Sequence, residues 1–137
     1  MTRLRVFALC VVVWSVALLV PVPSKPFADT GITVPDLKFY VSKLIHVAGY
    51  AFLTAFVAFL PISRAKRLGL VLFLSLHGAL SEAFQWWFTS YRSSSLRDVG
   101  LDHLGILIGL LATWNRWRVV PPEHRPAEPN LAPVEQR

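Results

Sequence analysis

The chain has 137 residues, of which 54% are hydrophobic and 16% charged, and its formal net charge is +6. This length predicts a single domain, and the hydrophobic share is too high for an ordinary soluble one. The basic residues lie between and beside long apolar runs, where membrane proteins place them, so we exclude nucleic-acid binding. Cys10 is the only cysteine and lies inside an apolar run, which excludes an intramolecular disulfide and favours a structural role for this residue.

Four long apolar runs predict an all-α fold, an integral membrane four-helix bundle that crosses the inner (cytoplasmic) cell membrane several times. The predicted spans are residues 4–22, 41–60, 68–88 and 99–117. Together they make one transmembrane domain over residues 1–119. Residues 120–137 are rich in proline and charge and lack apolar periodicity, so we expect a disordered cytoplasmic tail.

The first run has two interpretations. Arg3 and Arg5 precede an apolar stretch of a length that also suits the core of a signal peptide. The following segment, PVPSKPF, lacks the pattern of small residues that a cleavage site needs. We therefore expect a retained first helix, with a cleaved signal as the alternative.

The segment between the first two runs is polar, and its prolines, including Pro35, argue against a continuous helix. We expect a short interfacial helix from Asp36, which is suited to cap its start. The second span should end at Pro61, because proline breaks the helical hydrogen-bond pattern.

The orientation follows from the basic residues that flank the spans. Those on one side are Arg3, Arg5, Arg64, Lys66, Arg67, Arg116 and Arg118. Basic residues occur on the other side as well, but the turn at residues 64–67 is the shortest and most densely charged. By the positive-inside rule this turn and both termini are cytoplasmic, an N-in and C-in arrangement.

Two helical faces carry polar and small residues at spacings of three and four positions, which place residues on one side of a helix. On the third span the face consists of Val71, Ser75, Gly78, Glu82, Gln85 and Thr89. On the fourth span it consists of Asp98, Asp102, Gly105 and Gly109. The second face contains GxxxG, a pattern for close helix packing in membranes, so we expect these two faces to pack against each other.

Polar residues from three spans should meet at one depth in the outer leaflet, because they lie at the outer ends of the second, third and fourth spans. The candidate ligand-binding residues are Lys43, Tyr50, Gln85, Arg92, Asp98 and Asp102. The candidate catalytic residues are His46 and Glu82, as a base and the group that orients it. His77 points away from Glu82 and is interpreted as a packing residue, and His103 as an interfacial one.

This cluster has a structural and a functional interpretation. Lys43, Arg92 and Arg97 balance three acids, which is sufficient to hold helix ends together. A charge inside the hydrocarbon is nevertheless unfavourable by about 2.5–3.5 kcal/mol, and ionisable residues there usually serve a function. We therefore favour a ligand or reaction site.

The same residues resemble the VanZ-like family of small membrane proteins. The first part of the family pattern, D-K-x-x-H-x-x-x-Y, is matched by Ser42, Lys43, His46 and Tyr50. The second part, E-x-x-Q, a loop arginine and D-x-x-x-N-x-x-G-x-x-x-G, is matched by Glu82, Gln85, Arg92, Asp98, Asp102, Gly105 and Gly109. Ser42 stands where the family usually has an acid, and Asp102 where it usually has asparagine. The match covers residues 42–109.

The resemblance implies a role at the cell envelope, in tolerance to glycopeptides such as teicoplanin. We expect the polar site to bind an anionic membrane lipid, an envelope precursor or a glycopeptide, with Lys43 and Arg92 contacting phosphate or carboxylate. One alternative is an enzyme acting on a lipid-linked substrate, with His46 and the acids as possible ligands of a divalent metal. Another is a non-catalytic partner subunit. No pair of ligands has a local metal-binding signature, so the sequence assigns no metal and no cofactor, and no oligomeric state.

Overall fold

The structure, a computed structural model, describes residues 2–19, 34–88 and 96–118. These residues form five helices: α1 (Thr2–Leu19), α2 (Val34–Ala58), α3 (Arg64–Phe88), α4 (Leu96–Ala112) and α5 (Trp114–Arg118). The prediction of an all-α fold is thereby confirmed for the described residues. Arg92 and the predicted tail at residues 120–137 lie outside them.

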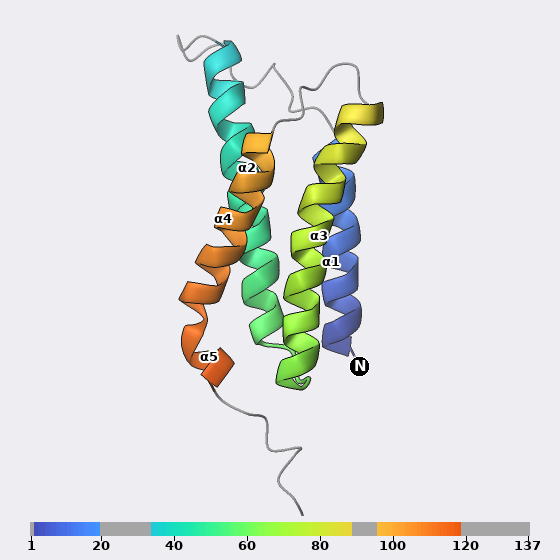
Figure 1. Ribbon diagram of the computed structural model, residues 1–137, viewed down its shortest axis with the longest axis vertical. Coiled ribbons are helices and arrows are strands. Elements are labelled where there is room, and N and C mark those ends of the chain that lie inside the picture. Colours follow the sequence, from blue (N-terminus) through green and yellow to red (C-terminus); the bar gives the residue numbers. More distant parts are fainter. Residues whose placement is uncertain (1, 20–33, 89–95, 119–137) are drawn as a thin grey trace, which may run out of the picture.

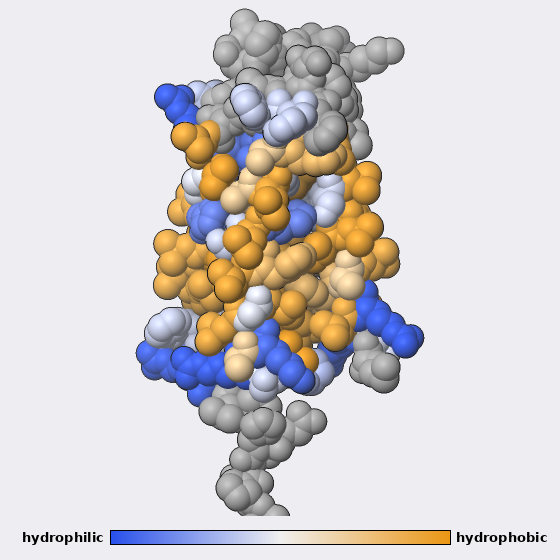
Figure 2. All heavy atoms as spheres, turned by 45° about the vertical axis from the view of Figure 1, so that its right-hand side comes forward, coloured by the Kyte–Doolittle hydropathy of each residue, from blue (hydrophilic) through white to orange (hydrophobic). Residues whose placement is uncertain are grey.

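Three helices are long and apolar enough to cross a membrane, over Thr2–Leu19, Tyr40–Ala58 and Arg64–Trp87. Their outward side chains are mostly large and apolar, and they form a broad hydrophobic band across the face seen in Figure 2. Helix α4 has 17 residues, or about 26 Å at about 1.5 Å per residue, slightly less than a hydrocarbon core of about 30 Å. A fourth crossing by α4 therefore stays a prediction.

Helix α2 is the centre of the arrangement. Successive long helices run in opposite directions, and α2 contacts α1, α3 and α4 (Figure 1). One stripe of α2 is completely enclosed, with no residue more than 1% exposed: His46, Tyr50, Leu53, Thr54 and Val57. Their spacing is that of a single helical face, so this face of α2 packs against the other helices.

The glycine stripe of α4 packs against α2, and the expectation that it packs against the third span was wrong. A Cβ atom built on Gly105 would lie 2.4 Å from the carbonyl oxygen of Val47, and one on Gly109 would lie 2.6 Å from that of Ala51. Both carbonyls belong to α2. The absence of side chains at the two glycines therefore brings the backbones of α2 and α4 together. A GxxxG pattern predicts close packing but carries no information about the partner.

Helix α3 meets α4 through other residues of the predicted face. A Cβ on Gly78 would lie 3.1 Å from Oδ2 of Asp102, and Ser75 Oγ lies 2.7 Å from Nε2 of His103. Asp102 thus reaches α3 at a position where that helix has no side chain. The predicted contact between the third and fourth spans exists, but Gly78 rather than Gly105 makes room for it.

The turn between α2 and α3 is tight and is held by Arg67. Ser63 caps α3, its hydroxyl accepting a hydrogen bond from the Lys66 amide at 3.4 Å. The buried guanidinium of Arg67 donates to the carbonyls of Leu60 at 3.0 Å and of Arg116 at 3.2 Å. Arg67 therefore satisfies carbonyl groups at the ends of two helices, in addition to adding charge to this turn.

Two helix boundaries differ from prediction. Helix α2 begins at Val34, so the expected interfacial helix from Asp36 is not separate but is the first part of the helix that contains the second span. Pro35 is compatible with this because an amide hydrogen has no helical partner in the first turn. The fourth span is interrupted at Thr113, whose hydroxyl donates to the Gly109 carbonyl at 2.6 Å and accepts from the Trp117 indole at 3.0 Å.

Candidate functional site

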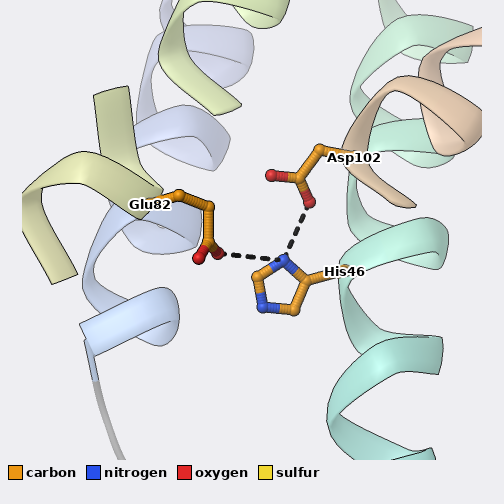
Figure 3. A group of neighbouring side chains, drawn as sticks. All are labelled: His46, Glu82 and Asp102. Atoms are coloured by element: carbon orange, nitrogen blue, oxygen red, sulfur yellow. Dashed lines mark hydrogen bonds and ion pairs between the residues drawn. The ribbon is translucent and has the colours of Figure 1, made fainter. Parts of the chain in front are cut away.

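Three ionisable side chains from three helices meet inside the protein (Figure 3). His46 comes from α2, Glu82 from α3 and Asp102 from α4, and their exposed fractions are 1%, 4% and 0%. Nδ1 of His46 lies 2.8 Å from Oδ1 of Asp102 and 3.9 Å from Oε1 of Glu82. One ring nitrogen thus faces both carboxylates, and the other points away from them (Figure 3). We call these residues the buried triad.

The closer partner of His46 is Asp102. The sequence pattern had paired His46 with Glu82, as base and orienting group. The 2.8 Å contact with Asp102 is a hydrogen bond, whereas the 3.9 Å distance from Nδ1 to Oε1 of Glu82 is too long for one. Asp102, which the sequence analysis names as a ligand-binding residue, therefore orients the imidazole ring in place of Glu82.

A second polar contact joins α2 and α4 one helical turn away. Lys43 forms an ion pair with Asp98, whose side chains are 21% and 8% exposed. Lys43 precedes His46 by three residues, and Asp98 precedes Asp102 by four. The spacings predicted from sequence thus place two contacts side by side between the same helices. The Lys43–Asp98 pair is partly accessible, whereas the His46–Asp102 pair is enclosed.

A chain of hydrogen bonds connects α1, α3 and α2 on another side of the triad. Oγ of Ser15 lies 2.9 Å from Nε2 of His77, and Nδ1 of His77 lies 2.8 Å from the hydroxyl of Tyr50. His77 is therefore a hydrogen-bonded residue in addition to a packing one. Its partners are 62 and 27 positions away in the chain, and no local sequence pattern links them.

The remaining candidates occupy different places. Gln85 is buried, and its amide donates to the carbonyl of Leu18 on α1 at 3.2 Å.

Tyr50 is fully buried, and its ring centroid lies 5.9 Å from that of Trp14 in an edge-on arrangement. Trp14 fits there because Gly49 has no side chain, since a Cβ at this position would lie 2.2 Å from the indole. His103 is exposed, and its interfacial place stays a prediction.

An apolar groove of about 380 Å³ lies between α1 and α3. Its lining includes Leu18, Phe73, Leu80 and Phe84, together with Ser15, His77 and Ser81. Ser81 is the neighbour of Glu82 in the chain, and His77 belongs to the hydrogen-bond chain above. The groove is therefore largely apolar, and its polar lining comes from Ser15, His77 and Ser81.

Two kinds of chemistry are compatible with the buried triad. An imidazole held by a carboxylate is the arrangement of a general base or acid. Alternatively, one nitrogen and two carboxylate oxygens within 4.8 Å of one another are suitable ligands for a metal ion. Both depend on the low polarity of the surroundings, where electrostatic interactions are stronger than in water.

These features define an all-helical membrane protein with an ionisable cluster enclosed between its helices. No family model matches the chain, and neither a curated protein nor a solved structure matches it.

Proposed function

We propose that the chain is a VanZ-like, four-span membrane protein that binds an anionic, lipid-linked compound of the cell envelope through a polar site in the outer leaflet. The observation that carries this proposal is the meeting of His46, Glu82 and Asp102 from three helices in an apolar interior. Ionisable groups in such a place are unfavourable and usually mark a site of function.

The proposed orientation rests on the charge of one end of the molecule. Exposed basic side chains gather at the end formed by the start of α1, the turn between α2 and α3, and α5 (Figure 2). They include Arg3, Arg64, Lys66, Arg116 and Arg118. The positive-inside rule makes this end cytoplasmic, so the Lys43–Asp98 pair faces outward. The contacts of α1 with α2 and α3 support its being a retained helix.

Cysteine labelling is expected to give this orientation directly. In a Cys10→Ala background, cysteine is introduced at Leu96, which is 91% exposed, or at Ala65, exposed in the first turn of α3. A membrane-impermeant maleimide should label Leu96→Cys in intact cells and spare Ala65→Cys. Both should react after permeabilisation, which serves as the control. Labelling of Ala65→Cys alone in intact cells would reverse the proposed orientation.

The ligand is proposed to use both the polar and the apolar surfaces. Lys43 at the outer end and the loop residue Arg92 would contact the phosphate or carboxylate, Arg92 with two parallel hydrogen bonds. The groove between α1 and α3 would take a hydrocarbon chain of the same molecule, because its lining is largely apolar and reaches Ser81 and His77. A lipid-linked anion has both chemical parts, and this favours it over a free phosphate.

Exchange of Arg92 for alanine tests the binding role. We expect Arg92→Ala to remain folded, because the sequence predicts a polar loop at this position and a charge in such a loop contributes little to stability. Its content of co-purified anionic lipid, measured by mass spectrometry, should fall about tenfold, the equivalent of about 1.4 kcal/mol, and the glycopeptide tolerance of the host should fall with it. Arg97→Ala, at an exposed position on α4, is the matched control and should behave as wild type. Unchanged lipid and tolerance in Arg92→Ala would remove this arginine from the site.

The second candidate function is an enzyme acting on a lipid-linked substrate. The observation that favours it is the 2.8 Å hydrogen bond between His46 and Asp102, which leaves the other ring nitrogen directed away from the two carboxylates. In that case the purified protein should consume its co-purified lipid with a pH-dependent rate, and His46→Gln should lack this turnover. Stable retention of intact lipid supports binding without reaction.

A further inference from the structure

We propose that the buried triad of His46, Glu82 and Asp102 is a binding site for one divalent transition-metal ion of the Zn²⁺ or Mn²⁺ type. The inference goes beyond the proposed function, because it holds whether or not the bound compound is an anionic lipid. It rests on the geometry of three side chains, the environment of one oxygen atom and the charge of the set.

The geometry is close to that of a coordination sphere. Each residue offers one ligand atom, and the three atoms lie within 4.8 Å of one another. Zinc ligands at bond lengths of about 2.0–2.2 Å are about 3.5 Å apart in a tetrahedral site. The two distances from Nδ1 of His46, 2.8 Å and 3.9 Å, lie on either side of this value. Small side-chain movements are therefore enough to place all three atoms around one ion.

The second carboxylate oxygen of Asp102 provides an independent reason. Oδ2 of Asp102 is buried and accepts no hydrogen bond within the described part of the chain. Figure 3 shows this oxygen directed toward the side of the triad where Glu82 lies. Buried polar atoms nearly always have a partner, because losing water without replacement is unfavourable. An ion between Asp102 and Glu82 would supply that partner.

The formal charge of the ligand set also matches a divalent ion. Two carboxylates and a neutral imidazole carry two negative charges, which a divalent cation balances. The Lys43–Asp98 pair one turn away is balanced by itself. Metal binding is therefore one way to keep two acids ionised in an apolar interior, where an isolated charge is strongly disfavoured.

The ligand types narrow the choice of metal. Imidazole nitrogen suits zinc and the later transition metals, and carboxylate oxygen suits manganese and magnesium. Magnesium usually binds through oxygen alone and retains several waters, which an enclosed site with a histidine does not favour. The sequence argument against a metal relied on the lack of a local ligand pair. Here every ligand comes from a different helix, so only tertiary packing assembles the set.

The test measures bound metal in the full-length protein, purified in detergent with an affinity tag that contains no histidine. The protein is stripped with a chelator, incubated with Zn²⁺, Mn²⁺ or Mg²⁺, desalted and examined by elemental mass spectrometry. We expect about one equivalent of Zn²⁺ or Mn²⁺, a higher melting temperature with the ion, and little Mg²⁺. His46→Gln and Asp102→Asn should bind at least about tenfold less, because even outer-shell residues alter metal affinity about 10–100-fold.

His103→Gln is the matched control, since it removes an exposed histidine next to Asp102 in the chain and should retain the ion. Wild type that takes up no more metal than His46→Gln would overturn the proposal, as would equal loss in His103→Gln. Should the triad variants fail to fold, Co²⁺ added to wild type decides the matter. A visible absorption band of nitrogen- and oxygen-coordinated cobalt supports the site, and its absence overturns it. Lipid content, measured on the same samples, reports separately on the proposed function.

Discussion

Gly105→Ala is expected to destabilise the protein strongly, although it adds a single methyl group. The new Cβ would lie 2.4 Å from the carbonyl oxygen of Val47, a backbone atom of α2 that cannot rotate away. Helices α2 and α4 would have to separate, with loss of the close packing that holds helices together in a membrane. Overpacking usually destabilises by about 1–3 kcal/mol, and we expect Gly105→Ala at the upper end of this range and Gly105→Leu beyond it.

Gly100 on the same helix provides a control, because exchange for alanine there is expected to keep or slightly raise the stability instead of lowering it. A Cβ on Gly100 would have no atom of the described residues within 4 Å, so Gly100→Ala creates no clash with them. Alanine favours a helix over glycine by about 0.5–1 kcal/mol, and this variant should be as stable as wild type or slightly more so. Thermal unfolding in detergent distinguishes the two variants. Equal melting temperatures for Gly105→Ala and Gly100→Ala would mean that α2 and α4 do not pack as described.

Asp102→Ala is expected to have the second large effect, because it removes the hydrogen-bond partner of a histidine that is 1% exposed. A buried polar group left without its partner costs about 1–3 kcal/mol, and more when charge is involved. We therefore expect the free energy of unfolding to fall by about 3 kcal/mol. The measurement uses a chelator, so that an ion in the buried triad does not contribute.

A double-mutant cycle separates this interaction from the general effect of truncation. His46→Ala alone should also destabilise, but His46→Ala with Asp102→Ala should cost less than the sum of both changes, with a coupling of about 1–3 kcal/mol. His103→Ala combined with Asp102→Ala is the reference pair, because His103 bonds to Ser75 and to the Val99 carbonyl instead. Additive effects of His46 and Asp102 would contradict the buried hydrogen bond between them.

The sequence by itself determined the helical fold class and which side of each helix carries the ionisable residues. Long apolar runs require helices in a membrane, because every backbone hydrogen bond is then satisfied within the segment. Lys43 and His46 are three residues apart and Asp98 and Asp102 four, so each set lies on one face of its helix, and the structure joins the four residues as two neighbouring pairs. The shared face of each set could be predicted because helical periodicity is a local property of the chain.

Only the tertiary structure decided which faces meet. The glycines at 105 and 109 had two possible neighbours, and the backbone of α2 rather than that of α3 lies against them. His46 had two possible carboxylates, and Asp102 is the closer. The bonds of His77 join three helices. Periodicity gives the direction of a side chain around its own helix, but the partner depends on how separate helices cross, and that is set by the packing of all of them together.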